Sequence, residues 1–169
     1  IGVWNEVRKL FSSTSEARMR GYGPGRFSFN VPGGRCDYCE GQGVKKIAMS
    51  FLPDVRLCCD RCNGDRFGHE TLDVKYSGVS IGEVLAMSFD EAVKFFNAHP
   101  KLIYSMQLFQ DVGLGYLTLG QQSPTLSGGE AQRIKLVAEL AKNRPRLERL
   151  GVINRHTVYV LDEPTIGLH

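Results

Sequence analysis

Two copies of the pattern C-x-x-C-x-G constrain most strongly what this chain can fold into. The first copy is CDYCEGQG at 36–43, and the second is CDRCNGDR at 59–66. In each copy the two-residue gap lets both thiolates point at one ion, and the glycine permits the left-handed turn that this geometry tends to need. The 19 residues between Cys39 and Cys59 fall within the spacing expected for a site of four cysteines.

Four thiolates close a tetrahedral shell around zinc and leave no open position, so the predicted site is structural, with one zinc per chain. Its predicted ligands are Cys36, Cys39, Cys59 and Cys62. A disulfide pair and a redox dithiol are the alternatives, and the paired spacing favours zinc over both. The fifth cysteine, Cys58, is expected to be a bystander thiol.

The second informative stretch is PTLSGGEAQRIKL at 124–136. Ser127 followed three residues later by Glu130 is a capping box, which predicts the start of a helix. Glycines at a helix start lower helix propensity, but their N–H groups can approach an anion closely, as at phosphate-binding helix N-termini. The stretch therefore predicts a phosphate site, with a simple helix cap as the alternative.

A third stretch, VYVLDEPT at 158–165, predicts a strand buried on both faces that ends in two acids. Asp162 at the strand tip is placed to hold Mg²⁺, and Glu163 beside it could orient or deprotonate an attacking water. The alternative is a pair of charged residues in a loop.

The remaining patterns are local. Apolar spacing over 3–11 predicts a helix, and apolar alternation over 27–31 predicts a short strand. Two S-x-x-E patterns, beginning at Ser80 and Ser88, are capping boxes within a region, 80–119, that we expect to be helical.

Charge suggests a polyanionic partner. The net charge is only +3, but bases outnumber acids in 1–35 and again in 142–156. Solvated surface explains such segments equally well, so charge alone does not decide between the two readings. No apolar run is long enough to span a bilayer, so no membrane partner and a cytoplasmic location are expected. The chain begins with Ile rather than Met, which suggests an excised fragment.

Taken together, these motifs resemble those of the ABC-type ATPases. LSGGEAQR at 126–133 is similar to their signature motif, VYVLDE at 158–163 to Walker B, and GLH at 167–169 to the start of the D-loop. More narrowly, GRFSFNVPGGRCDYCEGQG and LDEPTIGLH resemble the UvrA family, the damage-sensing subunits of bacterial nucleotide excision repair. The order of elements is similar to the second, C-terminal ATPase half of that family.

The resemblance implies an α+β fragment of an ABC ATPase domain, with a zinc module inserted in a helical signature subdomain. Residues 1–32 would begin that subdomain with a basic glycine-rich loop, and 33–72 would form the zinc module. Residues 73–150 would be the helical signature subdomain, and 151–169 the Walker B strand and the start of the D-loop.

The resemblance also implies how ATP and Mg²⁺ would be used. The signature residues would contact the γ-phosphate of ATP held by another ATPase half, whereas Asp162 and Glu163 would serve this half's own site. The implied partners are lesion-containing double-stranded DNA, UvrB and a second copy of the parent protein. The residues around the basic glycine-rich loop that would face DNA are Arg18, Arg20, Arg26 and Arg35. The sequence contains no G-x-x-x-x-G-K-[ST] motif, so the chain alone is not expected to hydrolyse ATP. The nucleotide-site residues of the signature would be Ser127, Gly128, Gly129, Glu130 and Gln132.

Three rival classes are less consistent with the motifs. A transporter or SMC-type ATPase would share LSGGE but not the four-cysteine insertion. A DnaJ-like chaperone needs four C-x-x-C-x-G-x-G repeats and would bind two zinc ions. A purely DNA-binding zinc protein leaves LSGGE and LDEP unexplained.

Overall fold

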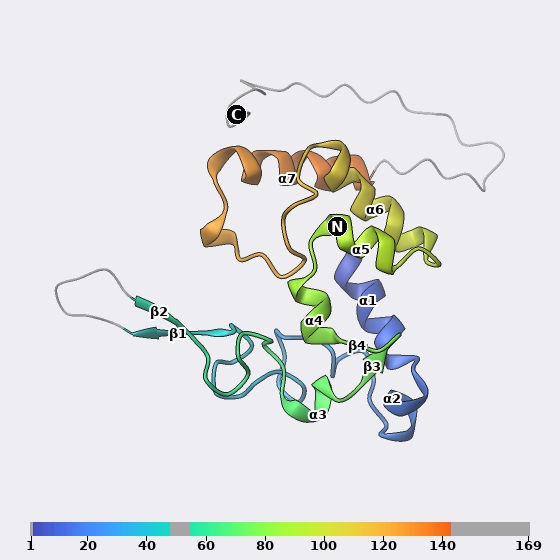
Figure 1. Ribbon diagram of the computed structural model, residues 1–169, viewed down its shortest axis with the longest axis vertical. Helices are drawn as coiled ribbons and strands as arrows, with labels where there is room; N and C mark the ends of the chain where they lie inside the picture. Colours follow the sequence, from blue (N-terminus) through green and yellow to red (C-terminus); the bar gives the residue numbers. More distant parts are fainter. Residues whose placement is uncertain (1, 48–54, 143–169) are drawn as a thin grey trace.

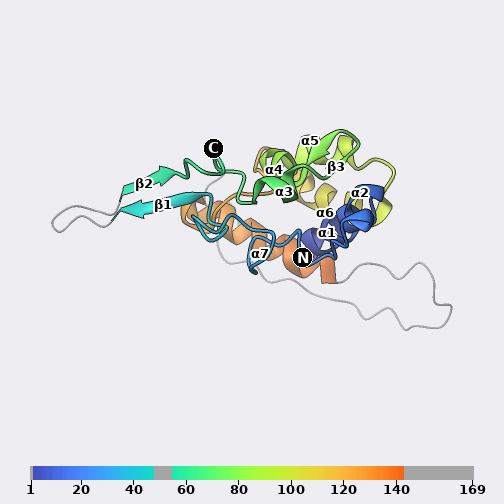
Figure 2. The same cartoon turned by 90° about the horizontal axis from the view of Figure 1, so that it is seen from below.

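The computed structural model describes residues 2–47 and 55–142. Figure 1 shows α1 and α4–α7 grouped in one helical body, with the β1–β2 hairpin projecting from the turns beneath it, and Figure 2 shows the same hairpin from below. The predicted strand at 158–161, with Asp162 and Glu163, lies outside the described residues. The elements are α1 (Val3–Ser12), α2 (Ser15–Met19), β1 (Val44–Ile47), β2 (Val55–Cys58), α3 (His69–Leu72), β3 (Lys75–Tyr76), β4 (Val79–Ser80), α4 (Ile81–Ala86), α5 (Phe89–Phe95), α6 (Pro100–Asp111), a 3₁₀ turn η1 (Ser123–Thr125) and α7 (Gly128–Lys142).

Local sequence explains where the helices begin. Both predicted capping boxes are confirmed, because Ser80 begins α4 and Ser88 begins α5 with reciprocal bonds to the glutamate three residues on. Pro100 occupies the first turn of α6, where its missing N–H costs nothing. The helix expected over 3–11 is α1.

The strand predicted over 27–31 is wrong, because this segment consists of turns. Phe27 is fully buried without any strand pairing. The chain folds back so tightly that a Cβ on Gly34 would lie 1.7 Å from the carbonyl oxygen of Arg26. The apolar residues alternate here because turns bury some of them, and not because the backbone is extended.

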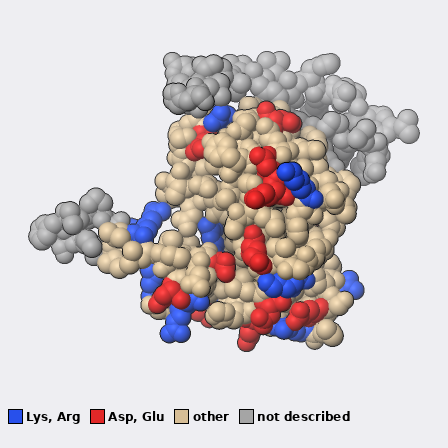
Figure 3. Space-filling model, viewed as in Figure 1, with Lys and Arg blue, Asp and Glu red and all other residues tan. Residues whose placement is uncertain are grey.

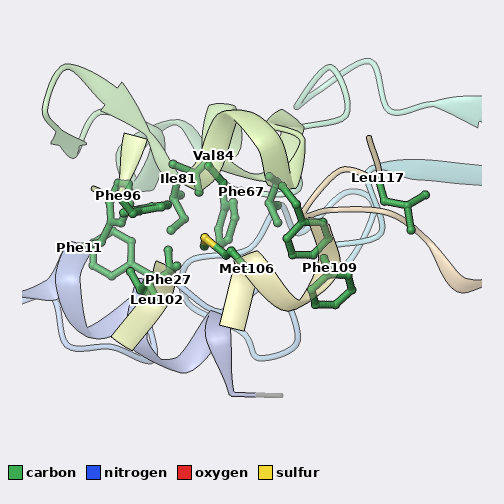
Figure 4. Close-up of a cluster of buried hydrophobic side chains, with 14 of the residues drawn as sticks. Phe11, Phe27, Phe67, Ile81, Val84, Phe96, Leu102, Met106, Phe109 and Leu117 are labelled. Carbon is green, nitrogen blue, oxygen red and sulfur yellow. The ribbon is translucent and has the colours of Figure 1, made fainter. Parts of the chain in front are cut away.

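One hydrophobic core joins the helices to the turns around the zinc module. Figure 4 shows Phe11 of α1, Phe27 and Phe67 of the turns and Met106 of α6 converging on a shared interior. Each of these four side chains is essentially inaccessible to solvent. Because apolar burial is the main favourable term in folding, this core fixes the cysteine segment to the helical body.

The described sheets are two short antiparallel hairpins, β1–β2 and β3–β4, so helices and turns dominate the described part of this α+β fold. In the first hairpin Val44 lies opposite Cys58 and Lys46 opposite Arg56. Among the described helices, none combines the length and apolar character needed to cross a membrane.

Candidate metal centre and signature turn

The four predicted ligands form one buried cluster. Their sulfur atoms all lie within 4.8 Å of one another. The Sγ–Sγ separation is 4.0 Å for Cys36 and Cys59 and 3.7 Å for Cys39 and Cys62. Tetrahedral zinc with Zn–S bonds of about 2.3 Å requires sulfur atoms about 3.8 Å apart, so the cluster fits zinc. Cys58 is exposed and does not belong to the cluster.

The two copies of the motif fold alike, which explains the glycine in each. Gly41 and Gly64 both have positive φ, 79° and 90°. A Cβ on Gly41 would lie 2.0 Å from the carbonyl oxygen of Phe29, so this position has no room for a side chain. The turn after the first pair also lets the Gly43 amide donate to the Cys39 sulfur at 3.2 Å.

The cluster needs a cation to hold its thiolates. Burial raises the pKa of Cys39 and of Cys62, although backbone amides act in the opposite direction. Burial also acts to raise the pKa of Cys59, but amides of Cys62 and Arg61 outweigh it and lower that pKa. A divalent ion would supply the positive charge that stabilises four thiolates in one buried site.

Two side chains join the zinc module to the segment that precedes the signature. Arg66 follows the second cysteine pair, and its Nη2 donates to the carbonyl oxygen of Gly120 at 2.5 Å. Gln122 Nε2 donates to the carbonyl oxygen of Gln42 at 2.9 Å. Burial lowers the pKa of Arg66, which the neighbouring cysteines act to raise. No sequence pattern indicated either link, because the partners are 54 and 80 residues apart.

The signature turn, residues 126–130, has the predicted capping box. The amide of Ser127 donates to Glu130 Oε2 at 2.6 Å, and the amide of Glu130 donates to Ser127 Oγ at 3.3 Å. Helix α7 begins at Gly128 and runs for 15 residues. Ser127 and Gly128 are exposed, whereas Gly129 is buried.

The four arginines predicted to contact DNA differ in their surroundings. Arg18 is exposed. Arg20 pairs with Glu16 at 2.5 Å and lies 3.5 Å from Asp73.

Arg26 pairs with Glu70 at 2.6 Å, donates to Thr71 at 3.0 Å and lies over the Tyr22 ring. Arg35 is half-buried, and its Nε has no hydrogen-bond partner among the described residues. Arg20 and Arg26 are therefore held by acids, whereas Arg18 is exposed and Arg35 is half-buried.

No protein-family model matches the chain. Among curated proteins, UvrABC system protein A of Thermus thermophilus is 55% identical over 168 residues, which is 99% of this chain. The same-named protein of Pseudomonas aeruginosa is 54% identical over 168 residues. The chain spans 17% of the length of each.

A solved structure agrees with the sequence comparison. The crystal structure of UvrA2 from Deinococcus radiodurans matches 84% of this chain and 17% of that one, with a TM-score of 0.81 and 49% identity. Identity of this degree across almost the whole chain, combined with the same fold and a four-cysteine cluster, shows that the chain belongs to the UvrA family and corresponds to one segment of it.

Proposed function

We propose that this chain is the zinc-bearing signature segment of an ATPase that acts in nucleotide excision repair. The observation that carries the proposal is the exposed Ser127–Gly128 turn at the start of α7. It occurs in a chain 55% identical to a protein named for the UvrABC system. The parent protein would be an ATPase that recognises damaged duplex DNA.

The turn suits a phosphate for three reasons. Apart from its chain neighbours and the backbone of its own helix, no atom lies within 4 Å of the Cβ position of Gly128, so an anion can approach its backbone. The Ser127 hydroxyl lies beside it, and the 15-residue helix adds the positive end of its dipole. Gln132 is exposed one turn further along α7. These residues, with Gly129 and Glu130, would contact the γ-phosphate of ATP bound by another ATPase half.

The acids after the signature complete the proposal. Asp162 would hold Mg²⁺ and Glu163 would orient the attacking water in this half's own site. Mg²⁺ bound there would offset phosphate charge during hydrolysis. The zinc ion would be structural and would stabilise a module whose cysteines form much of its interior.

Duplex DNA containing a lesion is the proposed partner, together with UvrB and a second copy of the parent protein. Phosphates would be contacted by arginines of the glycine-rich loop. Arg18 would contribute most, because Arg20 and Arg26 already pair with acids. Arg35 is the fourth candidate.

The substitution Gly128→Ala tests the nucleotide site in the full-length protein. Open space around Gly128 means that the methyl group fits the fold, and alanine favours a helix over glycine, so Tm should hold or rise. The methyl group should nevertheless keep a phosphate from the backbone amide, and kcat/KM for ATP should fall by about tenfold or more.

Gly23→Ala is the matched control. Gly23 also has open space around it but lies far from the signature, so ATP turnover should be unchanged. Normal ATP turnover in Gly128→Ala would overturn the assignment of the turn. Failure of the wild-type gene to restore ultraviolet resistance to a bacterium lacking UvrA would overturn the repair role.

A further inference from the structure

One residue of the zinc module, Arg66, is tied to both cysteine pairs and to the segment that precedes the signature turn. It follows the second pair, and its backbone carbonyl oxygen accepts from the amide of Cys36, in the first pair, at 2.8 Å. Its φ of 68° lies in the left-handed region, which few residues with side chains adopt. The guanidinium lies 5.2 Å from the centre of the Phe29 ring and donates to the Gly120 carbonyl oxygen. Arg66 is therefore fixed both at its backbone and at its tip.

A second link starts from the peptide group between Gln42 and Gly43, just after the first cysteine pair. A trans peptide group is planar, so its N–H and C=O point in opposite directions. The N–H, which belongs to Gly43, donates to the Cys39 sulfur at 3.2 Å. The carbonyl oxygen, which belongs to Gln42, accepts from Gln122 Nε2 at 2.9 Å. One rigid group thus bridges a predicted zinc ligand and the segment before the signature turn.

Gln122 is also the residue at which the 3₁₀ turn η1 starts. Its carbonyl oxygen accepts from the Thr125 amide at 3.0 Å and from Thr125 Oγ1 at 2.7 Å. The Leu126 amide then donates to the Ser123 carbonyl oxygen at 3.2 Å, and Ser127 of the signature turn follows directly. Hydrogen bonds of a 3₁₀ turn have poor geometry, so the placement of so short a turn depends on what holds its ends. The Gln42–Gln122 bond holds the first end.

Gly120 is where the zinc module meets the helical body. Its carbonyl oxygen accepts from Arg66, and its amide donates to the carbonyl oxygen of Leu85 at 2.8 Å. A Cβ on Gly120 would lie 2.8 Å from that same oxygen, so the two backbones are too close for a side chain between them. The chain therefore leaves a fixed point at Gly120 and is tied to the zinc module again at Gln122, before it reaches the signature turn.

We propose that Arg66 and Gln122 are positioning residues that fix the signature turn to the zinc module, so that an intact metal site sets how the turn is presented to ATP. This inference rests on the proposed function, which assigns the turn to the γ-phosphate. Neither residue touches the nucleotide, because both act through the backbone at 120–126. The zinc module then serves ATP hydrolysis as well as its own stability.

The test compares the zinc-loaded full-length protein with its Gln122→Met variant, which keeps the length of the side chain and removes the amide donor. Figure 3 shows Lys and Arg side chains gathered along the base of the hairpin, so a neutral substitution avoids placing a new charge beside them. Without ATP, the Thr125 and Leu126 amides should exchange with deuterium about three- to tenfold faster, the range expected for the loss of one hydrogen bond.

Steady-state kinetics give the second measurement. The kcat for ATP should fall by a similar factor while KM stays unchanged. The reason is that ground-state binding of ATP depends mainly on the phosphate loop of the other ATPase half, whereas the signature turn would act in the transition state.

Gln110→Met is the matched control. Gln110 is half-buried like Gln122, and its Nε2 also donates between two elements, from α6 to Asp90 of α5 at 2.7 Å. Because this bond does not involve the zinc module, exchange at Thr125 and Leu126 and the kcat should equal those of wild type. Removal of zinc with a chelator should speed exchange at these two amides in wild type and in the control, but less in Gln122→Met, where the link is already absent.

Equal exchange at Thr125 and Leu126 in zinc-loaded wild type and Gln122→Met would overturn the link. Faster exchange with an unchanged kcat would overturn the coupling to ATP and leave the signature assignment, which Gly128→Ala tests, intact. An equal loss of turnover in Gln110→Met would also overturn the inference, since the effect would then be a general loosening. Absence of ATP turnover in wild type would overturn the proposed function itself, and the inference with it.

Discussion

The hydroxyl of Tyr116 donates a hydrogen bond to Glu130, the glutamate of the capping box that starts α7. The other carboxylate oxygen of Glu130 accepts from the Ser127 amide. This hydrogen bond raises the pKa of Tyr116 and lowers that of Glu130. Tyr116 is 58% exposed, so an aromatic ring on the surface steadies the glutamate that orients the signature turn.

Tyr116→Phe should loosen this turn without unfolding the helix. The ring remains and only the hydrogen bond is lost, so Tm should change little, because the contact is exposed. The backbone amides of Ser127 and Glu130, which the capping box pairs, should exchange with deuterium faster. Amides after Ser88, whose capping box has no tyrosine partner among the described residues, serve as the internal control. Equal exchange at the signature turn in both proteins would contradict this role for Tyr116.

Metal analysis should find one zinc ion per chain. Cys36→Ser should bind less than one zinc ion per chain, because the tetrahedral shell would lose one of its four thiolates. Cys58→Ser should leave zinc content unchanged, because this exposed thiol lies outside the cluster. Elemental analysis of protein purified without chelator checks both variants. Full zinc in Cys36→Ser would reject the ligand set.

The capping box of α4 should make stability depend on acid pH. Hydrogen bonds from Ser80, first from its side chain and then from its backbone, together with Lys75, lower the pKa of Glu83 to about 2 from 4.5. A lowered folded-state pKa means that the contribution is complete above 4.5 and is lost as the pH falls through about 2.

Glu83→Gln should therefore have a lower Tm than wild type at neutral pH, and the gap should narrow from about pH 4.5 towards pH 2. Thermal unfolding of both proteins across this range measures the gap. Acid also releases zinc from both proteins, so the difference between their Tm values reports the contribution of Glu83 alone. A gap that stays constant with pH would exclude Glu83 as the titrating group.

The 169-residue chain alone should not hydrolyse ATP, because its sequence has no lysine-bearing phosphate loop. In the full-length protein Glu163→Gln should instead trap bound ATP, since the carboxylate proposed to orient water would be gone. Turnover by the purified chain that disappears in Glu163→Gln would show that this expectation is wrong.

Arg18→Ala, at the end of α2, should flatten the salt dependence of duplex binding by about 0.9, whereas Arg26→Ala in the glycine-rich loop should change it less. The reason is that Arg18 is exposed, while Arg26 already pairs with Glu70. A competition assay on the full-length protein compares the two variants. A larger effect of Arg26→Ala would show that its ion pair opens for DNA.

Sequence by itself determined the parts of this protein that depend on residues close together along the chain. Two-residue gaps brought Cys36 to Cys39 and Cys59 to Cys62, and three-residue gaps identified the capping boxes, including the one at Ser127. In such cases backbone geometry alone sets the distance between the groups. The structure confirms the cysteine cluster and the three capping boxes.

Only the tertiary structure decided which distant side chains meet. Alternation over 27–31 predicted a strand, but close backbone packing at Gly34 imposed turns. The Tyr116–Glu130 contact and the Arg66–Gly120 bond join residues that no local spacing relates. These contacts form because one shared core packs α1, the turns and α4–α6 together. The hydrophobic effect that drives this packing is non-directional, so a short sequence pattern does not reveal which elements will contact each other.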